Sequence, residues 1–391
     1  MSRSRDISQI LGKTDATNVN NHPLLDTSAA VDSAEVVTLI TAHSSNLDSA
    51  DIQIISAPLT NRNLIINGAM NVAQRATSVA DMGGSGGYIT VDRFRIDTNG
   101  ASAGRFTMTQ TADGPSGFAN CTKLDVTTAD TSIAAGERLF LQQNIEGQNL
   151  QRVAKGTSDA QSLTLSFYVK GNAAATYVAG FYDNDNNRQV SKQFAVTTSW
   201  NRITLTFPPD TTGALDDDNA ASLQLRFYLH AGSNYTSGTI SETWIAADGT
   251  KSVGSGTTSI FDSTDRTFFI TGIQLEVGEQ ATPFEHRSYA DELIQCQRYY
   301  QSIDYYWATG TSSLNVHYYT PFPFPITMRA TPTMTASAYQ QNDGNATTRY
   351  NTTVVNGWIM HTASKTSCFM RGNHGNIYNI MSGRGKFEAE L

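Results

Sequence analysis

The part of the sequence richest in residues that could do chemistry is FEHRSYADELIQCQRYY, residues 284–300. It places an acid, a base and a cation, Glu285, His286 and Arg287, shortly before a thiol, Cys296. A cysteine nucleophile needs its thiol beside an imidazole, with a third group that orients the pair. Catalysis here would therefore require Cys296 to be exposed close to His286.

Helical spacing argues that Cys296 points inward instead. Ser288 can cap a helix that begins at residue 289, because Asp291 follows three residues later in a pattern close to a capping box. Four residues then fall on one apolar stripe at helical spacing: Leu293, Cys296, Tyr300 and Ile303. Buried thiols are inert, so we predict structural roles at a domain junction and no catalytic residue.

Acidic stretches elsewhere do not make a metal site. In FYDNDNNRQV, Asp183, Asp185 and Asn187 occupy the first, third and fifth positions of a calcium loop, but Arg188 stands where glycine is required. A tight hairpin turn explains the same residues, because Asn and Asp tolerate left-handed backbone conformations. The three adjacent aspartates at 216–218 are expected to be solvated, and we predict neither a metal nor a cofactor.

Composition limits the classes of partner. The chain has 391 residues, and its 27 Lys and Arg against 35 Asp and Glu give a net charge of −8. This balance argues against a nucleic-acid partner. No apolar run approaches the length of a membrane-spanning helix, so no membrane insertion is expected. The three cysteines, Cys121, Cys296 and Cys368, lack disulfide or zinc spacing and are expected to be buried hydrophobes.

Residues 1–60 cannot build an ordinary core, since the first aromatic residue of the chain is Tyr88. Within them VDSAEVVTLI, from residue 31, recurs approximately as LDSADIQIIS, from residue 47. Short repeats that cannot bury their own apolar face need neighbours, and other chains are the better explanation for two copies. Ile7, Ile10 and Leu11 share one face of a short predicted helix that would dock on another protein.

Residues 61–288 show the alternation of β-strands. Apolar residues occupy every second position in LTLSFYVKG (163–171), RITLTF (202–207), SLQLRFYLH (222–230) and ITGIQLEVG (270–278). Gly, Asn, Asp and Ser clusters separate these runs. The pattern predicts an antiparallel β-sandwich with one wet face on each sheet, and a jelly roll fits the number of strands.

Residues 289–391 are expected to form a linking helix and a small C-terminal β domain. In PFPFPITM, Pro321, Pro323 and Pro325 alternate, so their missing N–H groups all point to one side of an extended chain. Such a strand cannot be paired on that side. It should therefore lie at the edge of a sheet.

Aromatic residues in turn-rich segments of this last part are candidates for receptor contact. Flat rings with a polar handle beside them are typical of sugar recognition. Core packing is the alternative for each residue, and about one ring of each adjacent tyrosine pair is expected to be exposed. The candidates are Tyr305, Tyr306, Trp307, Tyr318, Tyr319 and Trp358.

Four segments carry a resemblance to a known family: NLIINGAMNVAQRATS (63–78), YITVDRF (88–94), GIQLEVGEQATPFEHRSYADELIQCQRYYQ (272–301) and PITMRATPTM (325–334). Together they resemble bacteriophage tail-fibre and virion structural proteins. In that family a jelly roll similar to carbohydrate-binding modules precedes a small β-rich tip. The SRSRDIS opening also looks like the virion-docking end of such fibres.

The resemblance implies a virion appendage, made in the host cytoplasm, that binds and does not catalyse. It implies a homotrimer attached through residues 1–60 to other tail or baseplate proteins, with a host-surface glycan as the expected receptor. A capsid or baseplate decoration protein without a receptor role is the alternative. A polysaccharide-degrading tailspike is less favoured, because the sequence shows no stacked β-helix repeat and no evident carboxyl pair.

Overall fold

A computed structural model describes residues 61–100, 102–310, 317–342, 349–350, 359–373 and 378–391. The side chains of residues 304–320, 336–362 and 369–384 lie outside this description. All described residues belong to one contact unit, residues 58–391. The docking candidates Ile7, Ile10 and Leu11 lie outside the described residues.

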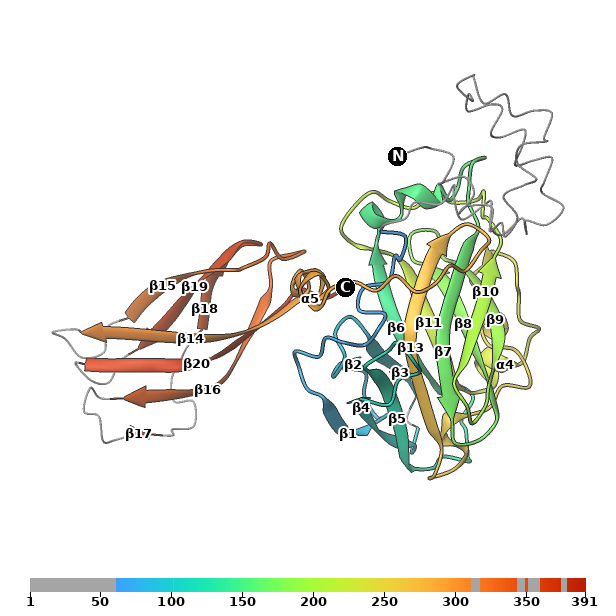
Figure 1. Cartoon of the computed structure of the whole chain (residues 1–391), viewed down its shortest axis with the longest axis horizontal. Coiled ribbons are helices and arrows are strands. Elements are labelled where there is room, and N and C mark those ends of the chain that lie inside the picture. The colour runs from blue at the N-terminus through green and yellow to red at the C-terminus, as the bar shows by residue number, and fades with distance from the viewer. Residues whose placement is uncertain (1–60, 101, 311–316, 343–348, 351–358, 374–377) are drawn as a thin grey trace, which may run out of the picture. The chain divides into compact units, whose positions relative to one another are not determined.

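The first part of the described chain is an antiparallel sandwich of two sheets. A six-stranded sheet has the order β1-β4-β5-β13-β7-β10, and a seven-stranded sheet has the order β12-β9-β8-β11-β6-β3-β2 (Figure 1). The strands are β1 (Ser78–Met82), β2 (Gly87–Tyr88), β3 (Arg95–Asn99), β4 (Arg105–Thr111), β5 (Cys121–Thr128), β6 (Arg138–Glu146), β7 (Leu163–Gly171), β8 (Ala175–Asp183), β9 (Arg188–Val196), β10 (Asn201–Phe207), β11 (Ala221–Ala231), β12 (Ile245–Ala246) and β13 (Thr267–Val277). The prediction of a mainly β, antiparallel fold is confirmed.

Alternation along the strands fills the space between the two sheets, as predicted. Leu165 and Phe167 of β7 and Leu225 and Phe227 of β11 are fully buried in one core. The ring of Phe167 meets the ring of Phe227 edge-on, with 5.0 Å between centroids. Edge-to-face packing of this kind adds to the free energy gained from area burial alone.

Short helical turns connect the strands. They are η3 (Gly147–Asn149), η4 (Gln151–Val153), α4 (Ser233–Thr236), η5 (Gly249–Lys251) and η6 (Ile260–Asp262). The segment that contains α4 and η5 packs on the outer side of the seven-stranded sheet, where Tyr235 and Val253 contact Phe140 and Tyr228. The predicted turn between β8 and β9 is confirmed, and Asn187 in it has a φ of 52°.

The helix after the sandwich is shorter than its apolar stripe predicted. Helix α5 (Tyr289–Gln297) begins where expected, and the Ser288 side chain accepts a hydrogen bond from Asp291 N. It ends at Gln297, so Tyr300 and Ile303 belong to the next strand and not to the helix. Instead of continuing the helix, Arg298 and Tyr299 donate hydrogen bonds to Glu146 of the sandwich.

No helix among the described residues has the length and apolar character of a membrane span.

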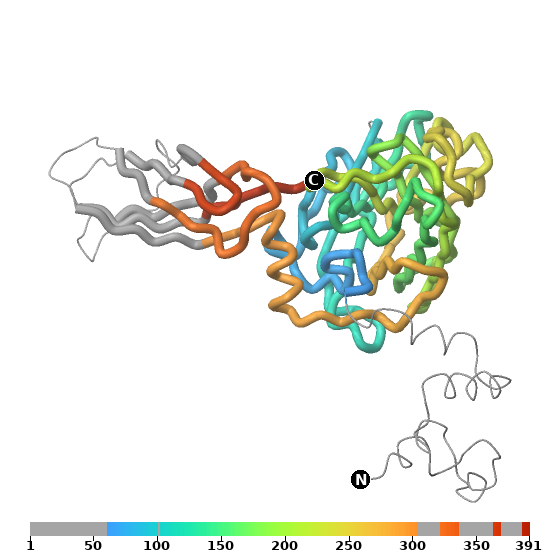
Figure 2. Tube along the Cα trace, turned by 90° about the horizontal axis from the view of Figure 1, so that it is seen from above, coloured from blue at the N-terminus to red at the C-terminus, as the bar shows by residue number. Residues whose placement is uncertain are grey.

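The last part of the chain forms two smaller antiparallel sheets. Their orders are β14-β20-β16-β17 and β15-β19-β18. The strands are β14 (Tyr300–Gly310), β15 (His317–Pro323), β16 (Thr333–Asn342), β17 (Arg349–Tyr350), β18 (Ile359–Ala363), β19 (Ser367–Asn373) and β20 (Tyr378–Glu388). The proline-bearing strand β15 lies at a sheet edge, as predicted. After β20 the chain returns to the sandwich (Figure 2), and Ala389 N donates to Tyr299 O at 2.8 Å.

Candidate functional site

The segment that first suggested chemistry ties the beginning of the sandwich to its end. The Glu285 carboxylate accepts hydrogen bonds from the backbone N–H groups of Asn61 and Asn63, at 2.6 and 2.8 Å. Arg287 donates to the carbonyl oxygens of Asn63 and Ile65, at 2.5 and 3.2 Å. These side chains satisfy backbone groups, so the predicted structural role is confirmed.

The thiol and the imidazole of this segment lie in different environments. Cys296 is fully buried, and burial raises the pKa of its thiol well above the ordinary value. His286 is exposed, and its ring packs 4.9 Å from that of Phe284. The acid, base and thiol that are close in sequence therefore do not assemble into a nucleophilic site.

Glu146 joins the sandwich to the residues that follow α5, and we call this contact the junction. Arg298 Nε and Nη2 donate to the two Glu146 oxygens at 3.0 and 2.8 Å, and Tyr299 OH donates at 2.5 Å. Burial raises the pKa of Glu146, but the hydrogen bonds from Arg298 and Tyr299 outweigh it and leave that pKa below its ordinary value.

A second set of ion pairs holds the end of the chain. Arg93 is fully buried, pairs with Glu390, and lies 3.4 Å from the centroid of the Tyr299 ring. Arg75 pairs with Glu390 at 3.1 Å and with Asp92 at 3.8 Å. Burial raises the pKa of Asp92 to about 6.

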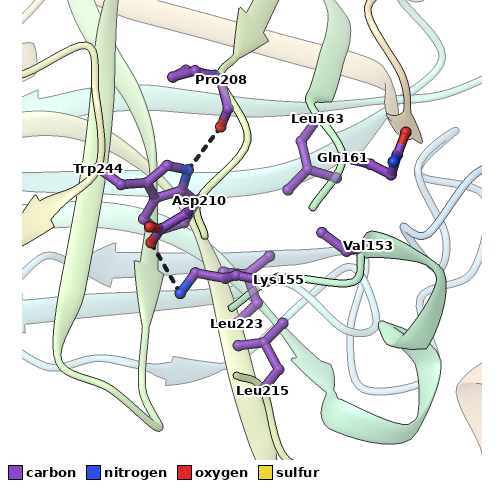
Figure 3. A pocket seen from close by; sticks show the side chains of 9 residues that line it. All are labelled: Val153, Lys155, Gln161, Leu163, Pro208, Asp210, Leu215, Leu223 and Trp244. Atoms are coloured by element: carbon purple, nitrogen blue, oxygen red, sulfur yellow. Dashed lines mark hydrogen bonds and ion pairs between the residues drawn. The ribbon is translucent and has the colours of Figure 1, made fainter. Parts of the chain in front are cut away.

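The pocket in Figure 3 is lined mostly by apolar side chains and contains the ion pair between Lys155 and Asp210. The buried ammonium of Lys155 lies 2.5 Å from Asp183 and 3.1 Å from Asp210, and it donates to the Thr212 and Gly213 carbonyls at 2.9 Å each. The cavity volume is ≈ 10 Å³, room for about one water molecule. Its lining residues are Val153, Lys155, Gln161, Leu163, Pro208, Asp210, Leu215, Leu223 and Trp244. This network fixes turns and leaves no space for a sugar.

A serine, a histidine and a glutamate that are far apart in sequence also meet. His230 Nδ1 lies 2.7 Å from Ser259 Oγ, and its Nε2 lies 3.1 Å from Glu137. Hydrolases use the same residue types in this order. Here Ser259 Oγ accepts a hydrogen bond from Phe261 N and caps η6, while the His230 side chain is fully buried. Burial lowers the pKa of His230, which favours the neutral imidazole, and we interpret the three residues as a structural network.

The outer side of the seven-stranded sheet carries an alternating ladder of rings and guanidinium groups. Arg226 on β11 lies 4.2 Å from the Tyr182 ring centroid and 4.9 Å from that of Phe140. On the other flank of Phe140, Arg138 lies 5.3 Å from the Phe140 centroid and 5.3 Å from that of Tyr235. Arginine–aromatic stacking fixes both components in place.

Hydrogen bonds orient the groups of this ladder further. Arg226 Nε donates to Gln224 at 3.1 Å, and its Nη1 donates to Tyr228 OH at 3.2 Å. In the register of the strands Arg226 is paired with Gln142, which is paired with Arg95. We call this surface the arginine face and define it by Arg95, Arg138, Phe140, Gln142, Tyr182, Gln224, Arg226 and Tyr235.

The arginine face was not predicted from the sequence, although a signal for it is present. In RLFLQQN the residues Arg138, Phe140 and Gln142 alternate with the buried Leu139 and Leu141. Phe140 and Gln142 are nevertheless buried, at 1% and 3% exposure, so the outer side of this strand is covered and not merely solvated.

The residues that were predicted to contact a receptor lie on strands, and their side chains lie outside the described residues. In β14, Tyr305, Tyr306 and Trp307 pair in register with Gly383, Ser382 and Met381. In β15, Tyr318 and Tyr319 pair with Gly372 and Arg371. These five residues are therefore part of regular strands and not of turns, and Trp358 lies outside the described residues.

The acidic residues and cysteines considered above lie as follows in the structure. Residues 216–218 are exposed. Within the described part of the chain, no three His, Cys, Asp or Glu side chains come together as a metal site. All three cysteines are buried and free.

Comparison with known proteins yields matches among solved structures. No protein-family model matches the chain, and no curated protein matches it. The carbohydrate-binding module TmCBM61, in complex with beta-1,4-galactotriose, is 7% identical, with a TM-score of 0.30, over 56% of this chain and 99% of that chain. The xylan-binding domain CBM22-1 from Paenibacillus barcinonensis is 13% identical, with a TM-score of 0.27, over 57% of this chain and 100% of that chain.

A bacteriophage protein is also among the matches. The enzymatically active domain of bacteriophage CBA120 tailspike protein 4 is 13% identical, with a TM-score of 0.28, over 55% of this chain and 21% of that chain. Similarities of this size carry no argument about ligand or activity. The strand orders given above describe the fold on their own.

Proposed function

We propose that the protein is a structural component of a bacteriophage virion, a tail fibre that binds a glycan on the host surface. The arginine face carries the glycan part of this proposal. Sugars bind where flat apolar rings lie beside a few well-placed polar groups. Tyr182 and Tyr235 supply partly exposed rings on this face, and Gln224 and Arg226 supply polar groups, whereas the Phe140 ring is buried and only packs against Arg226.

The virion role is supported by the sequence alone. The segments at 63–78, 88–94, 272–301 and 325–334 resemble tail-fibre proteins, and residues 1–60 contain no Phe, Trp or Tyr from which to build an ordinary core. We propose that residues 1–60 form the virion-docking and trimerisation segment. Light scattering of the full chain should give the mass of a trimer, and deletion of residues 1–60 should abolish it. A mass of one or two chains would contradict this arrangement.

Binding to isolated bacterial envelope polysaccharides tests the glycan role. The full-length chain should be retained by at least one such polysaccharide, without release of reducing ends. Release of reducing ends would favour the polysaccharide-degrading alternative. No retention on any host polysaccharide that adsorbs the intact virion would refute the glycan role.

Labelling of virions tests the location. Antibody against residues 289–391 should mark the distal end of the tail. Labelling of the shell or baseplate would instead favour a decoration protein without a receptor role.

The C-terminal aromatic residues provide a second candidate surface for the same function. We expect Trp307→Ala to leave the melting temperature nearly unchanged and to weaken adsorption to host cells by about 1–3 kcal/mol, as for an interface aromatic. A large fall in melting temperature, with adsorption lost only in proportion to unfolded protein, would assign Trp307 to the core instead.

A further inference from the structure

We infer that the glycan bound at the arginine face is acidic, and that Arg226 receives the carboxylate of one of its sugars. This inference rests on the proposed function, because it names the class of glycan for the same surface. It is carried by the pairing of charges on the outer side of the seven-stranded sheet.

Arg226 is a fixed cation that has no carboxylate partner among the described residues. None of the described residues places an acid within ion-pair distance of it, and its polar partners are the neutral Gln224 and Tyr228. A guanidinium has five N–H donors, and three of them are used here, which leaves two. The residue is only partly buried, and we expect the remaining donors to be within reach of a ligand.

The face as a whole carries an excess of positive charge. Arg95 and Arg138 share one carboxylate, that of Asp97, and Arg226 pairs with none among the described residues, so the balance over these four residues is 3 − 1 = +2. Asp97 lies 3.0 Å from Arg95 but 3.8 Å from Arg138. The whole chain has a net charge of −8. A locally cationic surface on an acidic protein is complementary to an anionic ligand.

The geometry favours a planar acid in particular. Stacking between Tyr182 and Phe140 holds the Arg226 guanidinium in a fixed plane, and Gln224 fixes its rotation. A fixed guanidinium presents two parallel N–H groups, the arrangement that a carboxylate accepts from both oxygens. The partly exposed Tyr182 ring can meanwhile contact the apolar face of the sugar.

On the outer side of the six-stranded sheet, by contrast, the cations beside aromatic rings are paired with carboxylates. Lys170 lies 4.7 Å from the Phe269 ring centroid, so rings and cations alternate there too. However, Lys170 pairs with Asp113 at 2.8 Å, and Lys123 pairs with Asp125 at 2.8 Å. Each of these lysines has its own acid, whereas Arg226 has none among the described residues.

Carboxyl reduction provides the test. Every envelope polysaccharide that binds the full-length protein is compared before and after carbodiimide–borohydride reduction, which converts its carboxylates to neutral alcohols. Polygalacturonate and its methyl ester serve as a defined pair, and single-stranded DNA serves as a polyanion without sugar acids. Reduction should weaken binding about tenfold to a hundredfold, the range for a hydrogen-bonded charge.

Variants at Arg226 assign the effect to one side chain. Arg226→Gln should reproduce that loss on the native polysaccharide and bind native and reduced forms equally. Arg226→Lys should retain part of the binding, because it keeps the charge and loses the planar fork. Arg202→Gln is the matched control, since Arg202 lies on the six-stranded sheet and donates to Ser166 and to Thr282 O. It should bind like the wild type.

Three results would overturn the inference. They are equal binding of native and carboxyl-reduced polysaccharides, wild-type affinity in a folded Arg226→Gln protein, and equally tight binding of single-stranded DNA. The first two leave the glycan-binding function standing with a neutral ligand or another surface. If no polysaccharide binds at all, the proposed function fails together with this inference.

Discussion

The junction and the arginine face use the same residue types for different ends. In both, an arginine stacks on a tyrosine. Arg93 lies 3.4 Å from the centroid of the Tyr299 ring, and Tyr299 belongs to the junction; in the arginine face, Arg226 lies 4.2 Å from the centroid of the Tyr182 ring. Arg93 is fully buried and pairs with Glu390. Arg226 is partly exposed and bonds only neutral groups among the described residues.

Pairing and burial, and not residue type, separate a structural cation from a cation that can bind a ligand. A buried ion pair loses much of its stabilisation to desolvation, but the removal of one partner strands the other charge. An exposed, unpaired guanidinium contributes little to stability and remains free for a ligand. Substitutions in the junction should therefore change stability, whereas substitutions in the arginine face should change binding.

The largest effect on stability is expected at Glu146. The Glu146→Ala substitution leaves Arg298 and Tyr299 without their acceptor, so we expect the free energy of unfolding to fall by about 3–5 kcal/mol. Denaturant unfolding measures this loss. Glu279→Ala is the control, because Glu279 is exposed, and surface substitutions change stability by about 0.5 kcal/mol or less. Similar losses for the two variants would show that the junction does not hold the fold together.

A somewhat smaller effect is expected from the protonation of Asp92. Its pKa rises from 3.8 to about 6 on folding, which corresponds to about 3 kcal/mol. Because the folded pKa is the higher one, this stability is present below pH 4 and is lost as the pH rises through 6. Because Asn resembles the neutral carboxyl, the free energy of unfolding of the wild type should fall relative to that of Asp92→Asn by about 3 kcal/mol between pH 4 and 7, as unfolding curves of the two proteins would show.

Glu146 makes the opposite contribution to the pH profile. Its pKa is lowered on folding, so its contribution is present above the ordinary carboxyl pKa and is lost as the pH falls below it. Glu146→Ala should remove this loss at acid pH.

For Asp92, a difference in the free energy of unfolding between wild type and Asp92→Asn that stays constant from pH 4 to 7 would contradict its buried position.

The sandwich could be predicted from the sequence because the alternation of apolar and polar residues within each strand indicates which of its residues are buried. Leu163, Leu165, Phe167 and Val169 alternate with polar positions, and all four are buried in the core. The alternation of proline in β15 likewise predicted a sheet edge. The end of α5 was not predictable from local spacing, since Arg298 and Tyr299 are held by Glu146, which is about 150 residues away.

The arginine face could not be predicted because it depends on which strands are neighbours. Arg226 meets Phe140 and Tyr182 only because β11 lies between β6 and β8. No local pattern specifies that order. That no described carboxylate lies beside Arg226 is also a tertiary property, since the sequence contains 35 acids and does not indicate which of them come near it.

The smallest expected effect is at Tyr182, which positions Arg226 from one side. Tyr182→Ala removes the ring 4.2 Å from the guanidinium, so Arg226 should lose orientation, and glycan binding should weaken by about 0.5–1 kcal/mol, the range for an exposed cation–π contact. Tyr182→Phe keeps the ring and removes only the hydroxyl, which donates to Asn187 at 2.6 Å. Titration of both variants with the polysaccharide measures the difference. If Phe weakens binding as much as Ala does, the hydroxyl and not the stacked ring supports the ligand, and the account of Arg226 as a ring-oriented cation is wrong.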